Sequence, residues 1–145
     1  MGLNINYKEQ NKPNGIPESF KIGEKFIGSN SVALILGDNF FYGQGLNDQL
    51  QKIRTFNSGC TIYLKDVSNP ENYGVVKTNR KKIDLIVEKP KKFISSKAIT
   101  GLYLFDNKVV NLSKRLKPSK RKETEIVDLI KSVSYTHLRA HETLL

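Results

Sequence analysis

The segment Leu36-Gly37-Asp38-Asn39-Phe40-Phe41-Tyr42-Gly43 directly follows the apolar run Val32-Ala33-Leu34-Ile35-Leu36. That run is too short for an ordinary helix and has the β-branched side chains of a buried strand. Because it is apolar on both faces, it predicts a strand in the middle of a parallel sheet that helices cover on both sides. Ligands of open α/β sheets bind just past the carboxyl ends of the strands, and Asp38 and Asn39 fall at such a position.

Asp38 has two interpretations. A carboxylate at a strand end can hold a hard cation such as Mg²⁺, which in turn neutralises phosphate oxygens. Alternatively, the Asp-Asn pair only turns the chain and caps the segment that follows, which is a common use of aspartate. Gly37 leaves room for a ligand to approach the backbone closely. The local pattern alone leaves both interpretations open.

The composition is that of a soluble globular domain. The 145 residues are enough for one core, with 38% hydrophobic and 26% charged residues. No segment approaches the roughly 18 consecutive apolar residues of a membrane span. No cationic leader opens the chain, so we expect a cytoplasmic protein with no membrane partner. Cys60 is the only cysteine, which excludes an internal disulfide and a multi-cysteine metal site.

The net charge of +10 arises from 24 Lys and Arg against 14 Asp and Glu. This balance favours anionic partners, whether nucleotides, phosphosugars or nucleic acid. Much of the charge lies in three turn-like clusters, residues 79–82, 89–92 and 117–122, and charge runs in turns are usually solvated. A basic nucleic-acid-binding domain is an alternative that predicts binding weakened steeply by salt. Because no aromatic residues interleave with these clusters, we expect no nucleic-acid partner.

The last 13 residues, VSYTHLRAHETLL (133–145), look like translated sequencing-adaptor read-through. We therefore expect residues 1–132 to be the folded domain and residues 133–145 to be a non-native tail. Both histidines, His137 and His141, lie in this tail. Without the tail the chain has no histidine, which argues against catalysis or metal binding by histidine.

Strand-like and helix-like patterns alternate along the chain. The sequence predicts strands at 4–9, 32–36, 60–65, 75–78, 83–88 and 98–105, with 75–78 and 83–88 forming a hairpin. It predicts helices after Pro17, over 46–53, between Asp106 or Asn107 and Pro118, and over 125–131. Cys60 fits the apolar face of its strand, so we interpret it as a core residue and not as a nucleophile. The alternation predicts an α/β fold with a mixed sheet.

Seven segments, in order, resemble successive motifs of the sugar nucleotidylyltransferase family. They are GLNINYKEQ (2–10), NGIPESF (14–20), LGDNFFYG (36–43), NPENYGVV (69–76), VEKP (87–90), AITGLYLFDNKVV (98–110) and LKPSKRKETEIVD (116–128). The similarity covers nearly all of residues 2–132, and it is greatest to the branch that acts on dTTP and glucose 1-phosphate. It implies a Rossmann-like nucleotidyltransferase fold with a mixed sheet, of which residues 1–132 are the incomplete central part.

The resemblance also implies an activity. The family branch transfers a nucleotidyl group from dTTP to glucose 1-phosphate, giving dTDP-glucose and pyrophosphate, with Mg²⁺ as cofactor, in the route to dTDP-rhamnose. UTP and CTP remain alternative nucleotides. A sugar phosphate is already an anionic nucleophile, so the reaction suits a chain without histidine and requires mainly positioning and charge. The full-length protein is implied to be a homo-oligomer, a tetramer in the family.

The resemblance assigns expected roles to individual residues. Asp38 matches the metal-ligating aspartate, and Gln10 and Gly15 match the loop that reads the pyrimidine base. The sugar-phosphate side is matched by Tyr73 and Gly74, by Glu88 and Lys89, and by Thr100 in the strand that closes the sugar pocket. Asp38 and Lys89 are the expected catalytic residues. Without the resemblance, these positions would be interpreted as solvated loops, turns and strand ends.

The chain also departs from the family pattern. The glycine-rich loop GGxGTRLxPxT, the lysine segment after it and the second metal-binding aspartate are absent. GIPES at 15–19 replaces the commoner GLAQA, and Lys122-Glu123-Thr124 replaces Gly-Glu-Leu. We therefore expect the chain to be the middle of a longer protein and to show negligible turnover alone. A non-catalytic regulatory relative is a further possibility.

Overall fold

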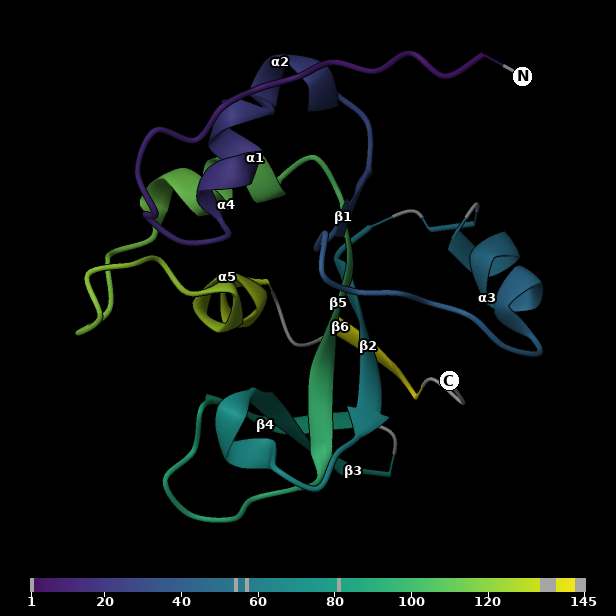
Figure 1. Cartoon of the computed structure of the whole chain (residues 1–145), viewed down its shortest axis with the longest axis vertical. Helices are drawn as coiled ribbons and strands as arrows, with labels where there is room; N and C mark the ends of the chain where they lie inside the picture. The colour runs from purple at the N-terminus through teal and green to yellow at the C-terminus, as the bar shows by residue number, and fades with distance from the viewer. Residues whose placement is uncertain (1, 54, 57, 81, 134–137, 143–145) are drawn as a thin grey trace.

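Figure 1 shows the computed structural model of the chain, which describes residues 2–53, 55–56, 58–80, 82–133 and 138–142. The helices are α1 (Glu18–Ile22), α2 (Glu24–Ile27), α3 (Leu46–Ile53), α4 (Val109–Arg115) and α5 (Ile126–Ser132), with a 3₁₀ turn at Pro70–Asn72. The strands are β1 (Val32–Ile35), β2 (Cys60–Asp66), β3 (Gly74–Asn79), β4 (Lys82–Glu88), β5 (Lys97–Phe105) and β6 (Leu138–Glu142).

These strands form one mixed sheet. Its order is β4-β3-β5-β2-β6, and β1 pairs with β5. The β2–β6 pair is parallel and the other pairs are antiparallel. The predicted α/β fold with a mixed sheet and the predicted hairpin of β3 and β4 are therefore confirmed.

The sheet divides around β5. Strand β2 pairs along one edge of β5, from Asp66 opposite Lys97 to Cys60 opposite Phe105. The other edge is shared, since β1 pairs with its last four residues and Val75 of β3 pairs with Ala98 near its start. Between these two contacts the edge around Thr100 and Gly101 has no strand beside it in the described structure. The divergence of β1 and β3 therefore leaves a fork at the middle of β5.

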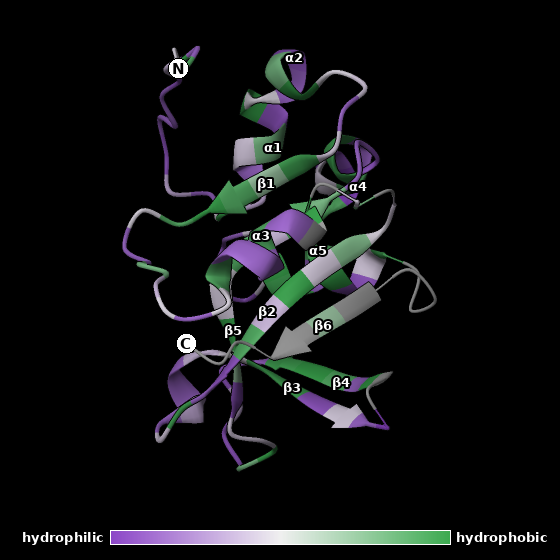
Figure 2. Ribbon diagram, turned by 90° about the vertical axis from the view of Figure 1, so that its right-hand side faces the viewer, coloured by the Kyte–Doolittle hydropathy of each residue, from purple (hydrophilic) through white to green (hydrophobic). Residues whose placement is uncertain are grey.

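Helices cover the sheet on both faces. Figure 1 shows α3 on one side of the sheet and α1, α4 and α5 on the other, and Figure 2 shows α3 in front. The larger core cluster joins Phe20 of α1, Val109 of α4 and Leu129 of α5 to the sheet. On the opposite face, Tyr63, Leu102 and Leu104 contact Phe41, Ile53 and Phe56. Apolar burial on both faces thus holds β5 in place.

Cys60 is fully buried in the larger cluster, which confirms the prediction of a core residue. Burial, together with the nearby charge of Asp106, raises the pKa of its thiol far above the usual range. Since the reactive form is the thiolate, we expect this side chain to be unreactive in the folded chain.

Two expectations about strands are wrong. The strand β1 is antiparallel to β5 and does not lie in the middle of a parallel sheet, and its residues alternate between half-buried and exposed, with Ile35 59% exposed. The apolar run is therefore covered on only one face in the described structure. Residues 4–9 form no strand, and Ile5 and Tyr7 are exposed. A strand needs a partner to pair its backbone groups, and the described residues supply none there.

The C-terminal residues contribute β6, which pairs in parallel with β2 from Cys60 opposite Leu138. A backbone ladder does not depend on side-chain identity, so this pairing leaves the expected non-native character of residues 133–145 a prediction. His137 lies outside the described residues. None of the described helices has the length and apolarity required to cross a membrane.

Candidate functional site

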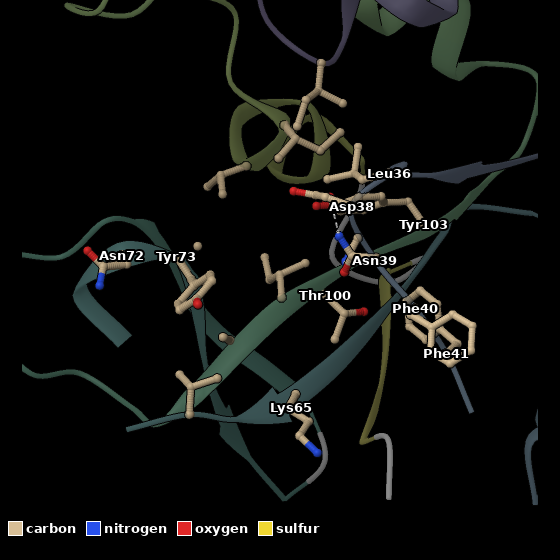
Figure 3. Close-up of a pocket in the computed structure, with 18 of the residues that line it drawn as sticks. Leu36, Asp38, Asn39, Phe40, Phe41, Lys65, Asn72, Tyr73, Thr100 and Tyr103 are labelled. Carbon is tan, nitrogen blue, oxygen red and sulfur yellow. Dashed lines mark hydrogen bonds between the residues drawn. The ribbon is translucent and has the colours of Figure 1, made fainter. Parts of the chain in front are cut away.

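A pocket of about 480 Å³ opens at the fork beside β5. Its walls come from the loop after β1, the start of β3, the end of β4, the first half of β5 and the start of α5 (Figure 3). The polar side chains that line it are Asp38, Asn39, Tyr42, Lys65, Asn72, Tyr73, Glu88, Thr100 and Tyr103. Segments far apart in the sequence thus converge on one cavity.

Asp38 reaches the pocket because Asn39 ties the loop to β5. The Asn39 Nδ2 donates to Asp38 Oδ1 at 2.8 Å, and the Gly101 N–H donates to Asn39 Oδ1 at 2.9 Å (Figure 3). The Leu36 N–H donates to the Gly101 carbonyl at 2.9 Å. Gly101 has to lack a side chain, since a Cβ there would overlap the Asn39 amide and lie 2.8 Å from its Oδ1.

The bridging role of Asn39 was not predicted from the sequence. The sequence placed Asn39 beside Asp38 at the strand end but gave no partner for its amide. That partner lies 62 residues further along the chain. Only the register between β1 and β5 reveals the contact.

Four predicted substrate-binding residues line the same pocket: Tyr73, Gly74, Glu88 and Thr100. Gly74 lies opposite Glu88 in the β3–β4 hairpin. A Cβ on Gly74 would lie 2.9 Å from Val127 Cγ2 and 3.1 Å from Glu88 Oε2, so the absence of a side chain keeps this wall open. The Thr100 hydroxyl is buried and has no hydrogen-bond partner in the part of the chain that the structure describes.

The pocket contains two groups with raised pKa values. Burial, and then the negative charge of Glu125, raise the pKa of Glu88, while the positive charges of Lys89 and Arg121 offset part of this effect. Burial, followed by the negative charges of Glu88 and Asp38, raises the pKa of Tyr103. The Tyr103 phenol therefore stays protonated near two carboxylates and can donate a hydrogen bond. No role was predicted for Tyr103 from the sequence, because this residue lies in an apolar segment for which only a strand was predicted.

Lys89 does not line the pocket. Its φ of 43° is left-handed, and its N–H donates to the Tyr73 carbonyl at 2.9 Å. The regular alternation of side chains along the strand therefore ends at Glu88. Lys89 is exposed, whereas the neighbouring Glu88 is half-buried and lines the pocket.

Gln10 and Gly15 lie in the loop beside the pocket and do not line it, whereas the next residue, Ile16, does. The Gln10 Nε2 donates to the Gly15 carbonyl at 3.3 Å and to Glu18 Oε2 at 2.7 Å. Gly15 has a φ of +103°, and a Cβ there would lie 2.9 Å from the Thr124 carbonyl carbon. Only glycine fits this close backbone approach.

The donor set around Asp38 suits one kind of metal binding. No group of three or more His, Cys, Asp or Glu side chains within the described ranges is placed to hold a metal ion. Asp38 offers a single exposed carboxylate. Because Mg²⁺ is often held by one or two carboxylates with waters and substrate phosphates, Asp38 fits as one ligand of such an ion and not as part of a protein cage.

Comparison with known proteins identifies relatives of this chain. A family model described as nucleotidyl transferase matches residues 1–144. Glucose-1-phosphate thymidylyltransferase of Neisseria meningitidis is 45% identical over 130 residues, which cover 89% of this chain and 45% of the relative. The enzyme of the same name from Mycobacterium tuberculosis is 42% identical over 130 residues, with the same coverage of both chains. The chain spans about half the length of the curated relatives it matches.

Solved structures agree with the fold. A Bacillus anthracis protein described as a glucose-1-phosphate thymidylyltransferase, solved in complex with sucrose, superposes with a TM-score of 0.82 at 36% identity. The match covers 95% of this chain and 56% of that one. A UDP-glucose pyrophosphorylase complexed with UDP-glucose gives a TM-score of 0.77 at 22% identity, over 94% of this chain and 57% of its own. The second likeness concerns the fold alone.

Proposed function

The chain belongs to the nucleotidyl transferase family, and on this premise we propose that the whole protein transfers a thymidylyl group from dTTP to glucose 1-phosphate. The products are dTDP-glucose and pyrophosphate. The observation that carries the proposal is the convergence of Asp38, Glu88 and Thr100 on one pocket in a chain whose curated relatives bear that activity in their names.

The reaction does not require the protein to transfer a proton. A phosphate oxygen of glucose 1-phosphate attacks the α-phosphorus of dTTP, and the bond from that phosphorus to the oxygen bridging to the β-phosphate breaks. The electron pair leaves with pyrophosphate, so atoms and charge balance without a general base. The rate enhancement then comes from holding the nucleophile and the α-phosphorus in line.

We assign Asp38 to Mg²⁺, with Asn39 holding the carboxylate in position. When bound, the ion supplies positive charge against the phosphate oxygens. Glu88 and the Thr100 hydroxyl are suited to bind sugar hydroxyls, because a carboxylate accepts hydrogen bonds and a hydroxyl both donates and accepts them. Tyr73 and Gly74 form the wall beside the sugar. Lys89 is assigned to the phosphate from outside the cavity, and Gln10 and Gly15 to the base.

Further assignments belong to the same proposal. The enzyme would work in the cytoplasm, in the route to dTDP-rhamnose, as a homo-oligomer and without a nucleic-acid partner. UTP and CTP are the alternative nucleotides, since the pocket chemistry described above concerns the sugar and phosphates and leaves the base to the loop around Gln10.

The test is pyrophosphate release by the full-length protein that carries this sequence. We expect release that depends on dTTP, glucose 1-phosphate and Mg²⁺ together, with dTDP-glucose identified by mass spectrometry. UTP and CTP in place of dTTP measure the nucleotide preference. Pyrophosphate release without glucose 1-phosphate, or turnover that is equal after removal of divalent ions, would contradict the proposal.

A further inference from the structure

Three polar side chains form a cluster where the loop enters α1. The Glu18 carboxylate accepts hydrogen bonds from Gln10 Nε2 at 2.7 Å and from Asn14 Nδ2 at 3.0 Å. These hydrogen bonds, that from Asn14 first, lower the pKa of Glu18. The carboxylate is therefore ionised at neutral pH and can only accept.

The cluster determines which way the Gln10 amide points. Its nitrogen faces two groups that only accept, the Glu18 carboxylate and the Gly15 carbonyl, the latter at 3.3 Å. An amide oxygen in that place would face both acceptors, so the nitrogen has to lie there. Both hydrogens of Nε2 are then used. The group of Gln10 that remains for a ligand is its carbonyl oxygen, which can only accept.

The loop that carries Gln10 is held in place by hydrogen bonds with Thr124. The Asn14 carbonyl accepts from the Thr124 N–H at 2.8 Å and from the Thr124 hydroxyl at 2.9 Å. Gly15 packs against the Thr124 backbone, and Ile16 lines the pocket. The loop between Gln10 and Ile16 is therefore held to Thr124 by two hydrogen bonds, next to the residue that lines the pocket.

We propose that Glu18 is a positioning residue that holds Gln10 as an acceptor and so selects nucleotides whose base carries an imide N–H. The inference rests on the proposed function, in which Gln10 reads the base. Thymine and uracil have a hydrogen on N3, which the Gln10 carbonyl can accept. Cytosine has a lone pair on N3, so two acceptors would face each other. Gln10 cannot turn its nitrogen toward cytosine without leaving Glu18 and Gly15. The arrangement does not separate thymine from uracil.

The test compares dTTP with dCTP in the full-length protein. We expect Glu18→Ala to lower the ratio of kcat/KM for dTTP over dCTP by about three- to tenfold, the size of one lost hydrogen-bond preference, and mainly through KM. Glu18→Gln retains a carbonyl that accepts from Gln10 and should restore most of the ratio. The matched control is Glu24→Ala, which removes a carboxylate paired with Lys114 at 2.6 Å on the neighbouring helix, and it should leave the ratio unchanged.

A double-variant cycle separates positioning from general damage to the fold. If Glu18 acts through Gln10, Glu18→Ala should not change the ratio further in a Gln10→Ala background. An unchanged ratio in Glu18→Ala, the same decrease in both backgrounds, or a wild type without preference for dTTP would each overturn the inference. Calorimetric binding of dTTP and dCTP without glucose 1-phosphate gives the ratio independently of turnover. Absence of turnover with normal binding preference would therefore count against the proposed function alone.

Discussion

Asn39 and Gly101 lie 62 residues apart in the chain, and Asn39 Oδ1 accepts a hydrogen bond from the Gly101 backbone N–H at a distance of 2.9 Å. Gly101 lies at the fork, where the Leu36 N–H that follows β1 donates a backbone hydrogen bond to the Gly101 carbonyl. The Asn39 side chain pairs with the Gly101 N–H beyond that point and at the same time donates to Asp38. The same side chain thus completes the sheet and positions the proposed metal ligand.

Gly101→Ala should disturb this contact. A Cβ would overlap the Asn39 amide, and because Gly101 does not have a positive φ, the effect comes from crowding and not from backbone strain. We expect a loss of about 1–3 kcal/mol in the free energy of unfolding, the usual range for overpacking, measured by urea denaturation. The stability control is Gly37→Ala, where a Cβ would meet nothing within 4 Å. Equal stability of the two variants would contradict the bridging role of Asn39.

Asp38→Asn should separate activity from stability. The side chain is exposed, so we expect the free energy of unfolding to change by no more than about 0.5 kcal/mol. Loss of the carboxylate removes the proposed ligand for Mg²⁺, and kcat should fall by about 10²-fold or more. Steady-state kinetics at several Mg²⁺ concentrations measures both. A variant with wild-type kcat would refute the assignment of Asp38.

Glu88→Gln should change the pH dependence of stability. The folded-state pKa of Glu88 is raised above its unfolded value by burial and by Glu125. The folded chain therefore binds more protons than the unfolded chain between those two pKa values, and stability falls as pH rises through that window. The glutamine side chain of the Glu88→Gln variant does not ionise, so the variant does not lose this stability as pH rises. Its free energy of unfolding relative to the wild type should rise with pH and level off above the folded pKa. A parallel pH profile for the two proteins would argue against a buried, ionisable Glu88.

Gly74→Ala should narrow the pocket. The new Cβ would lie 2.9 Å from a methyl group of Val127 and 3.1 Å from Glu88 Oε2. Glu88 can move, whereas Val127 is buried in the core, so Glu88 is the side chain expected to be displaced. We expect a KM for glucose 1-phosphate raised about tenfold, the effect of losing one hydrogen bond to the sugar, with little change in the KM for dTTP. Equal increases in both KM values would indicate general distortion.

The Cys60 thiol should be unreactive in the folded chain. It is fully buried and its pKa is raised by burial. We expect no reaction with Ellman's reagent under native conditions and one equivalent after denaturation in urea, because exposure restores an ordinary thiol. Fast modification of the native protein would show that the core cluster opens readily.

Local patterns in the sequence predicted much of the fold. The strand that begins at Cys60 and the hairpin of β3 and β4 were predicted correctly, because each depends on neighbours in the chain. The covering of β1 was not predictable, since an apolar run looks the same whether one or both of its faces are buried. The left-handed conformation of Lys89 was also missed, because lysine rarely adopts it.

The candidate site shows the same division. Motif resemblance named Asp38, Tyr73, Gly74, Glu88 and Thr100, and the structure brings them to one pocket. Tyr103 and the bridging contact of Asn39 depend on the register between distant strands. Tyr103 lies in a strand that contributes both to the core and to the pocket wall. Because its neighbours in the sequence are apolar, nothing in the sequence indicated that its hydroxyl group belongs to the site. The features that could not be predicted are therefore those that depend on which distant strands pair, and not on the residue types themselves.

The fork in the sheet also bears on how the molecule fluctuates. Most amide hydrogens of β5 are sequestered by ladders that only separation of whole strands can break. The Gly101 amide is sequestered by one side chain on a loop, and a swing of that loop frees it while the ladders persist. We therefore expect the Gly101 amide to exchange with solvent by local opening and not by global unfolding, and we expect a bound ligand that holds the Asn39 loop to slow this exchange.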